Sequence, residues 1–191
     1  MGSPKALLPI RGKSFIENVI QGLEASKVGK IFVVLGYNPD AIRQKIRDLD
    51  VTTLFNADYS QGQLSSLVTA LKHIQTAEPA ASIDAVLVHL VDHPFINTAL
   101  VDQMVDQFYA SKKLIVVPTY HGKRGHPVIF SKELFQEFLD APLDQGAKPV
   151  VHAHRAETLE IPTDDQGIVI DLDTPEEYRN HLGESEWPNS N

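Results

Sequence analysis

The run Ala85-Val-Leu-Val-His-Leu-Val-Asp92-His-Pro94 decides the fold class of this chain. Apolar, β-branched residues that stop at Asp and Pro predict a buried strand whose carboxyl end opens into a loop. A second run of this kind, Ile168-Val-Ile-Asp-Leu-Asp173, ends in the same way. Ligands of open α/β sheets bind at the carboxyl ends of the strands. We therefore expect Asp92 and Asp173 to lie together at one edge of such a sheet.

Two carboxylates from distant parts of the chain suit a Mg²⁺ site. Mg²⁺ takes one or two protein carboxylates and completes its octahedron with water and phosphate oxygens. Asp92 and Asp173 are therefore candidate metal ligands. The alternative for each residue is that its side chain caps the helix that follows it.

Composition restricts the class of protein. With 42% hydrophobic and 22% charged residues, the chain has the balance of one globular domain, which we place at residues 1–182, followed by a flexible tail at 183–191. No apolar run approaches the roughly 20 residues of a membrane helix, and the first residues lack a secretory pattern, so we expect no membrane association and a cytoplasmic location. A formal charge of -8 argues against nucleic acid as a partner.

Helical and extended patterns alternate along the chain, with short connections. Apolar residues at 3.6-residue spacing predict helices, and short β-branched runs predict strands. The expected helices lie around residues 15–23, 39–49, 64–74, 100–108, 132–139, 149–154 and 175–182. The expected strands lie around residues 31–35, 52–55, 85–92, 114–118, 158–161 and 168–170, with a hairpin over 119–130. This alternation predicts a three-layer α/β/α fold with a mostly parallel sheet.

Two segments in the first third of the chain offer groups to an anion. Lys5 follows a small, flexible stretch and can place a positive charge on a phosphate; the alternative is an exposed lysine without a ligand. The segment 56–67 runs from a strand end through Gly62 into a helix that begins with Ser65 and Ser66. Free N–H groups at such a helix start bind phosphate or carboxylate, although an ordinary helix cap has the same pattern. The other cationic candidates are Arg11, Lys13, Lys123 and Arg124.

The hairpin carries the tetrapeptide Arg124-Gly125-His126-Pro127. Glycine lets a backbone approach a ligand closely, and Arg and His recognise anionic or polar groups. An ordinary turn needs the glycine but not the whole tetrapeptide. Among the eight histidines, we assign a functional role to His126 and, less directly, to His93.

Five motifs occur in the order seen in a known family. They are Met1-Gly-Ser-Pro-Lys-Ala-Leu-Leu-Pro9, the stretch from Asn56 to Leu67, Asp92-His-Pro94, Arg124-Gly-His-Pro127 and Asp171-Leu-Asp-Thr-Pro-Glu176. In this order they resemble the MobA-like nucleotidyltransferases, whose fold is nucleotide-diphospho-sugar transferase-like, and most of all the molybdenum cofactor cytidylyltransferases. The resemblance extends to about Leu182. It implies transfer of CMP from CTP to the molybdopterin phosphate, with release of pyrophosphate and Mg²⁺ as cofactor.

The resemblance also assigns roles by position. Lys5 matches the lysine that binds the triphosphate, and Asp92 and Asp173 match the Mg²⁺ ligands. The residues that match the nucleotide- and acceptor-binding loop are Asn56, Gly62, Ser65 and Ser66, and those that match the acceptor-side motif are Arg124, Gly125, His126 and Pro127. The implied partners are CTP or another nucleoside triphosphate, a molybdopterin-type acceptor, and a molybdoenzyme or its chaperone.

One departure from the family pattern bears on the fold. Family members begin with a strand and a Leu-Ala-Ala-Gly loop ahead of the segment that matches Met1 to Pro9, and this stretch is absent here. We therefore expect the first strand of the sheet to be missing, which leaves unpaired N–H and C=O groups on its two neighbours. Two other functions stay open. One is transfer to another phosphorylated acceptor such as a sugar phosphate, and the other is a truncated, inactive relative that binds the cofactor.

Overall fold

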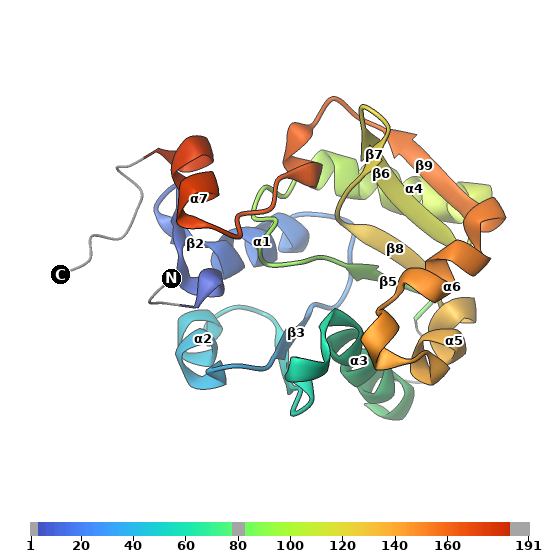
Figure 1. The fold of residues 1–191 in the computed structure, drawn as a ribbon, viewed down its shortest axis with the longest axis horizontal. Coiled ribbons are helices and arrows are strands. Elements are labelled where there is room, and N and C mark those ends of the chain that lie inside the picture. The colour runs from blue at the N-terminus through green and yellow to red at the C-terminus, as the bar shows by residue number, and fades with distance from the viewer. Residues whose placement is uncertain (1–3, 78–82, 184–191) are drawn as a thin grey trace.

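The computed structural model describes residues 4–77 and 83–183, and helices cover both faces of a central β layer (Figure 1). The helices are α1 (Phe15–Glu24), α2 (Pro39–Ile46), α3 (Gln63–Ala77), α4 (Thr98–Ser111), α5 (Phe135–Asp140), α6 (Lys148–Ala153) and α7 (Pro175–Leu182). The strands are β1 (Pro9–Ile10), β2 (Lys13–Ser14), β3 (Phe32–Leu35), β4 (Thr52–Phe55), β5 (Ala85–Val88), β6 (Ile115–Tyr120), β7 (Lys123–Arg124), β8 (Val128–Ser131) and β9 (Thr158–Pro162). Among the short 3₁₀ helices are η1 (Lys5–Leu7) and η6 (Gln166–Val169). The expected three-layer α/β class is confirmed.

The larger sheet has five strands, in the order β5-β8-β6-β7, with β9 beside β6. β8 is antiparallel to both β5 and β6, whereas β9 is parallel to β6. The sheet is therefore mixed: β5, β6 and β9 run in one direction, and β7 and β8 run in the other. The reason is that β8 returns after the β6–β7 hairpin and inserts between two strands that run in the same direction.

β3 and β4 form a separate, parallel pair. Within the described residues, β3 has no strand partner on its other side, and β5 likewise pairs with β8 alone. Phe32 of β3 and Val86 of β5 pack against the same cluster under α3, whereas Val33 and Leu87 pack on the side of α1. β3 and β5 thus belong to one layer and have two free edges. This arrangement is the one expected for a sheet whose first strand is missing.

The core lies on both faces of the larger sheet. On one face, α3 and α5 pack against Ile115 and Phe130. On the other, α4 packs against Val116 and Ile129. Successive residues of β6 and β8 therefore point to opposite faces, as the pleat of a strand requires. Because both faces are covered, β6 is buried from Ile115 through Thr119.

The expected hairpin is confirmed, but two strand expectations are not. β6 and β7 are joined by a two-residue turn at His121 and Gly122, both with positive φ, which suits the twist of a hairpin. The strand expected to end at Asp92 ends at Val88, so a loop begins four residues earlier.

The run Ile168–Ile170 does not form the expected strand. Its first two residues belong to η6, whose N-cap residue Asp165 accepts a hydrogen bond from the N–H of Gly167. The carbonyl of Ile168 accepts the N–H of His126, and the Ile168 side chain is buried. The backbone hydrogen bonds and the burial of this short apolar run are thus provided without strand pairing.

Two capping boxes fix helix starts on opposite ends of the chain. Ser14 and Glu17 cap α1, and Thr174 and Glu177 cap α7, which spans the helix expected over residues 175–182. In the described residues, no helix is long and apolar enough to cross a membrane. The boundary of the domain at 182 stays a prediction, and residues 184–191 of the expected tail lie outside the described residues.

Candidate active site

The loop that follows β5 carries Asp92 to the segment that precedes α7. The backbone N–H of Leu172 donates a 2.9 Å hydrogen bond to the carbonyl of Asp92. Val91, on the same loop, packs in the cluster of Leu8 and Leu172. Asp173 is the next residue along the chain, so the backbones of the two predicted carboxylates lie side by side.

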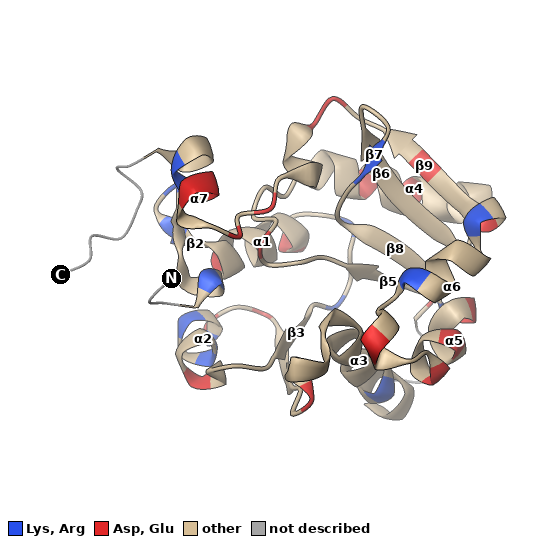
Figure 2. Ribbon diagram, viewed as in Figure 1, with Lys and Arg blue, Asp and Glu red and all other residues tan. Residues whose placement is uncertain are grey.

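Lys5 also reaches this place. Its Nζ atom makes a 2.5 Å ion pair with Oδ1 of Asp173, and both side chains are partly exposed. Figure 2 shows acidic residues on the segment that leads into α7 and a basic residue on the turn η1. The three residues predicted to be catalytic, Lys5, Asp92 and Asp173, are thus brought together from positions far apart in the sequence.

The start of α7 holds Asp173 in position. The N–H of Asp173 and the N–H of Thr174 both donate to Oε2 of Glu177, at 3.1 and 2.7 Å. Hydrogen bonds from Thr174, through its hydroxyl and its N–H, lower the pKa of Glu177. The Glu177 carboxylate therefore holds the backbone of Asp173 and Thr174 in place, and the Asp173 side chain pairs with Lys5.

Asp92 differs from Asp173 in its surroundings. Its Oδ1 atom is buried and has no hydrogen-bond partner in the structure. A buried carboxylate oxygen without a partner is costly unless a ligand satisfies it. A divalent cation is a suitable ligand, because hard cations prefer carboxylate oxygen. The described residues contain no group of three or more acidic or histidine side chains arranged to hold a metal, so most ligands of such a cation would come from water and substrate.

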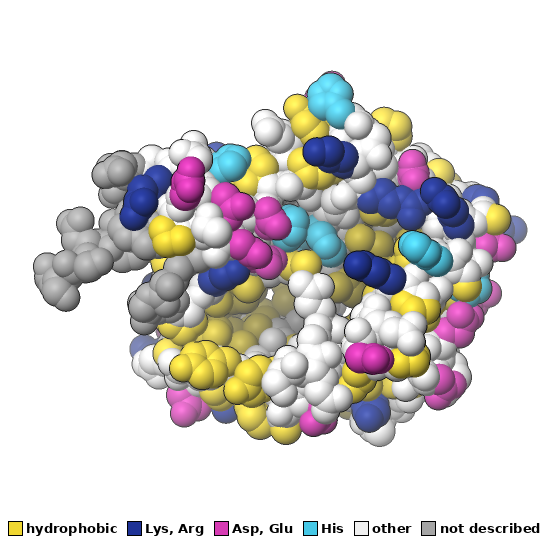
Figure 3. Space-filling view, viewed as in Figure 1, with side chains coloured by type: hydrophobic (Ala, Val, Ile, Leu, Met, Phe, Trp, Pro, Cys, Tyr) yellow, Lys and Arg dark blue, Asp and Glu magenta, His cyan; other side chains and the backbone are white. Residues whose placement is uncertain are grey.

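Two histidines of this loop, His89 and His93, lie close to a third, His126. Nε2 of His89 lies 2.8 Å from the carbonyl oxygen of His93, and the ring of His93 lies 4.8 Å from that of His126, centroid to centroid. Burial lowers the pKa of His89 to about 4, and burial together with the neighbouring His93 lowers the pKa of His126 to about 4. Both rings are therefore neutral at pH 7. The space-filling view shows histidine and acidic side chains together at the rim of a hollow lined by hydrophobic side chains (Figure 3).

The predicted loop from Asn56 to Ser66 is cross-linked by its own polar groups. Asn56 is buried, and its Nδ2 atom donates to Oγ of Ser65 and of Ser66, at 2.8 and 3.1 Å. The Ser65 hydroxyl donates in turn to the carbonyl of Gly62, where φ is +95°. These bonds fix the conformation of the loop ahead of α3. In this state the side chains of Asn56 and Ser65 are occupied within the protein.

The predicted acceptor-side tetrapeptide is pinned against β6 and η6. Gly125 donates its N–H to the carbonyl of Pro118, and a Cβ at Gly125 would lie 2.3 Å from the carbonyl oxygen of Ile168. The close approach that requires glycine is therefore to protein backbone. Arg124 pairs with Glu160 on β9, at 2.7 Å. Within the tetrapeptide, His126 faces the loop of Asp92 through its contact with His93, and Pro127 follows through a cis peptide bond.

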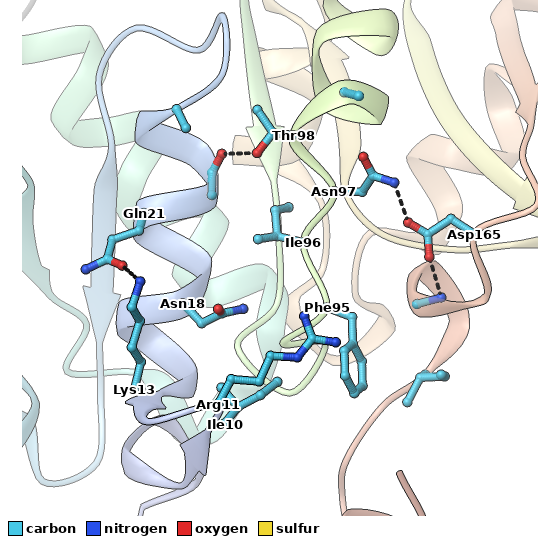
Figure 4. A pocket seen from close by; sticks show the side chains of 15 residues that line it. Ile10, Arg11, Lys13, Asn18, Gln21, Phe95, Ile96, Asn97, Thr98 and Asp165 are labelled. Atoms are coloured by element: carbon cyan, nitrogen blue, oxygen red, sulfur yellow. Dashed lines mark hydrogen bonds between the residues drawn. The ribbon is translucent and has the colours of Figure 1, made fainter. Parts of the chain in front are cut away.

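A cavity of about 660 Å³ lies elsewhere in the described residues. It is bounded by α1, the loop before α4 and η6, and Arg11 and Lys13 reach into it (Figure 4). Lys13 is bonded to Gln21, and Asn97 is bonded to Asp165 at 2.8 Å. None of the residues predicted to be catalytic lines this cavity. We therefore place the candidate site by its chemistry, at Lys5, Asp92 and Asp173.

His89 is the residue of this neighbourhood that we did not predict. The sequence holds one signal for it, since His89 and His93 flank Asp92 four positions apart. That spacing identifies a pair only if the segment is helical, whereas here it is a loop. The contact between the two residues forms because the loop brings the backbone carbonyl of His93 to the His89 ring.

The fold and this site define a nucleotidyltransferase-like protein. A family model described as the MobA-like NTP transferase domain matches residues 1–158, and the chain belongs to this family. The predicted family resemblance is therefore confirmed.

Individual relatives agree with this assignment. The chain is 22% identical over 179 residues to the molybdenum cofactor cytidylyltransferase of Escherichia coli, covering 93% of this chain and 86% of that protein. Among solved structures, it is similar to Rv0371c from Mycobacterium tuberculosis, with a TM-score of 0.81, 25% identity and coverage of 95% of this chain and 90% of that one. A structure of Rv0371c described as a complex with manganese superposes with a TM-score of 0.78 and 24% identity, over 95% and 92% of the two chains.

Proposed function

We propose that this protein transfers CMP from CTP to the phosphate of molybdopterin or the molybdenum cofactor. An oxygen of the acceptor phosphate attacks the α-phosphorus of CTP, a new P–O bond forms, and the bond to the departing pyrophosphate breaks. The observation that carries the proposal is that Lys5 pairs with Asp173 while the carbonyl of Asp92 accepts the N–H of Leu172, the residue before Asp173. The family and the named cytidylyltransferase relative support the choice of reaction.

Lys5 would neutralise charge on the triphosphate once a nucleotide displaces Asp173 from its ammonium group. Asp92 and Asp173 would hold a divalent cation, Mg²⁺ in our proposal, which supplies charge neutralisation at the phosphates when bound. The unpartnered Oδ1 of Asp92 fits this role, and the manganese complex of the similar Rv0371c structure is consistent with it. Reactions of this kind depend mainly on positioning and electrostatics.

The remaining predicted residues would shape the substrate pockets. Gly62 and Ser66 lie at the start of α3, where free N–H groups suit an anionic group, and Asn56 and Ser65 hold that loop in place. His126 would face the acceptor side, with Gly125 and Pro127 setting the backbone and Arg124 available if its pair with Glu160 opens. A cytoplasmic location and a molybdoenzyme or chaperone as recipient belong to the same proposal.

Turnover of radiolabelled CTP with release of pyrophosphate tests this reaction directly. A panel of acceptors, with molybdopterin beside sugar phosphates and with CTP beside GTP, distinguishes our proposal from transfer to another acceptor. Asp92→Ala should abolish metal-dependent nucleotide binding in calorimetry, because one of the two carboxylates is lost. Nucleotide affinity unchanged by this substitution would contradict the metal role of Asp92.

The second candidate is a protein that binds the cofactor without turnover. The free edges of β3 and β5 favour it, because the strand between them would support the loops of a complete site. Binding of the pterin without CTP turnover, both in this chain and in one extended ahead of Met1, would select this candidate.

A further inference from the structure

The proposed reaction makes no use of the cavity between α1, the turn that joins β1 to β2, and the loop before α4 (Figure 4). Its volume is about 660 Å³, within the roughly 300 to 1,000 Å³ of typical small-molecule sites. Lys5, Asp92 and Asp173 do not line it. A molecule bound in this cavity would therefore contact none of the residues predicted to be catalytic.

Arg11 brings to this cavity a positive charge that the protein itself does not pair. It lies on the two-residue turn between β1 and β2, where Arg11 and Gly12 both have positive φ. Such positions favour glycine, asparagine or aspartate, because a larger side chain is strained there. In the part of the chain that the structure describes, the exposed Arg11 guanidinium has no hydrogen bond or ion pair. Its donors are therefore available to a ligand.

Two further groups make the cavity positive. The ammonium group of Lys13 donates to Oε1 of Gln21, which leaves two of its three donors. α4 begins in another wall, at Thr98 and Ala99. The N–H groups of a first helical turn have no partner within the helix, and the helix dipole makes this end positive. An anion is therefore stabilised in this cavity.

The rest of the lining opposes an anion only weakly. Among the described residues that line the cavity, Asp165 is the one acid, and its carboxylate is already bonded. Oδ2 accepts from Nδ2 of Asn97 and Oδ1 accepts the N–H of Gly167, both at 2.8 Å. The cavity thus has an excess of positive charge in a chain whose net charge is -8. Its large apolar side chains are those of Ile10, Phe95, Ile96 and Ile170.

We propose that this cavity binds a small phosphorylated molecule, whose phosphate pairs with Arg11 in the positive field of Lys13 and the start of α4. The planar guanidinium forms two parallel hydrogen bonds with phosphate oxygens. A phosphate monoester carries about -1.5 to -2 charges at pH 7, so this field favours it over a carboxylate with one. The cavity is larger than a phosphate ion, and its apolar walls suit an organic part of the ligand.

Calorimetry with phenyl phosphate, titrated into the 191-residue chain, tests the site. Arg11→Gly removes the guanidinium and suits the φ of 50° at this position, so the variant should melt no lower than wild type. We expect its dissociation constant for phenyl phosphate to rise at least about 10-fold, because a charged hydrogen-bonded pair is lost. Equal affinity of Arg11→Gly and wild type, or no binding to wild type, would overturn the inference.

Lys112→Gly is the matched control for this substitution. Lys112 is also an exposed cation with positive φ, at 55°, but it does not line the cavity. The variant changes the net charge and the backbone freedom as Arg11→Gly does. Its affinity for phenyl phosphate should equal that of wild type, and an equal loss in both variants would assign binding to the overall charge of the protein.

Two smaller probes test the two parts of the ligand. Benzoate carries one negative charge on the same ring, and inorganic phosphate has no apolar part, so each should bind more weakly than phenyl phosphate. Benzoate that binds as tightly would overturn the choice of phosphate. Inorganic phosphate that binds as tightly would overturn the choice of a ligand with an organic part.

Lys5→Gln distinguishes this cavity from the candidate active site. This variant should bind phenyl phosphate as wild type does, and the amide resonances of Thr98 and Ala99 should shift on binding. If Lys5→Gln loses the probe while Arg11→Gly keeps it, the phosphate binds at the candidate active site and the inference is wrong. Because no measurement depends on CTP turnover, the cavity is tested independently of the proposed function.

Discussion

The β3–β4 pair and the five-stranded sheet differ in how completely their strands are bonded. In the larger sheet β6 pairs with β8, β9 and β7, and five of its residues are buried. β3 is bonded on one side, and two of its four residues are only partly buried. The loop of Asp92 leaves from β5, which within residues 4–77 and 83–183 pairs with β8 alone. The candidate site thus lies on the less completely bonded side of the molecule.

The pairing register of β3 with β4 shows which backbone N–H and C=O groups of β3 do not face β4. The carbonyls of Ile31 and Leu35 accept N–H groups from the β4 side. Because backbone groups alternate in direction along a strand, those of Phe32 and Val34 point to the free edge. Neither β3 nor β5 carries a charge or a proline, the usual protection of an edge strand. These edges are therefore suited to pairing with another strand.

The largest expected effect comes from supplying that strand. We expect an apolar strand of about five residues with a Leu-Ala-Ala-Gly loop, fused ahead of Met1, to stabilise the fold by about 4 kcal/mol, since several new backbone bonds each contribute about 1 kcal/mol. For a chain of this size the melting temperature would rise by about 10 °C. Calorimetry measures this, and hydrogen exchange should show new protection at Phe32 and Val34.

The control for this fusion carries a proline in the middle of the added strand, which removes a donor and prevents regular pairing. If the proline fusion stabilises as much as the apolar one, the added segment acts by something other than strand pairing. If neither changes the melting temperature, the free edges of β3 and β5 do not accept a strand.

On the well-bonded side, the largest effect is expected from Gly125→Ala. The new Cβ would lie 2.3 Å from the carbonyl oxygen of Ile168, and a backbone atom cannot move aside cheaply. We expect a loss of about 3 kcal/mol in the free energy of unfolding, measured with urea. Gly29→Ala, where nothing lies within 4 Å of the added atom, should be nearly neutral. Full stability of Gly125→Ala with lost acceptor binding would instead assign the glycine to ligand approach.

Acid should destabilise the histidine neighbourhood. The pKa of His89 and of His126 is about 4 in the folded chain, against 6.5 ordinarily. Between these pH values the unfolded chain binds more protons, so the free energy of unfolding falls as pH falls from about 6.5 towards 4 and is level above this window. We expect a loss of about 2 kcal/mol between pH 7 and 5.5. Urea unfolding at several pH values measures it.

His89→Phe tests the origin of this slope, because it removes one of the two groups. The pH dependence should fall by about half in that variant, while the exposed His152→Phe should keep it. An unchanged slope in His89→Phe would place the titrating groups elsewhere in the chain.

The features that could be predicted from the sequence are turns and helix starts, which neighbouring residues determine. The hairpin follows from the glycine of a two-residue turn, and the start of α7 follows from a capping box. The nearness of the Asp92 and Asp173 backbones was expected from the rule that strand ends gather at one edge, but neither residue ends a strand: β5 ends at Val88, and the second run begins as a 3₁₀ turn.

What could not be predicted depends on distant pairing. The insertion of β8 between β5 and β6 leaves no local pattern, and the pairing of β9 with β6 brings Glu160 to Arg124. The hydrogen bond from Asn56 to Ser65 could not be predicted either. The same residues suit a loop whose side chains bind a ligand and a loop whose side chains bond to one another. Sequence alone predicted that the backbones of Asp92 and Asp173 lie near each other, but not which bonds the side chains of the other predicted residues make.

The smallest expected effect is at the cap of α7, the helix that begins just after Asp173. Thr174→Ala removes the hydroxyl that accepts the N–H of Glu177 at 3.2 Å, and such caps contribute about 1 kcal/mol. Because this cap is exposed, we expect a loss at or below that value in urea unfolding, and Thr174→Ser should restore it. Ser14→Ala removes the equivalent hydroxyl at α1, where the residue is buried, and should cost more. If the two alanine variants lose the same stability, burial does not distinguish the two caps. The comparison between the β3–β4 pair and the five-stranded sheet must then rest on strand pairing alone.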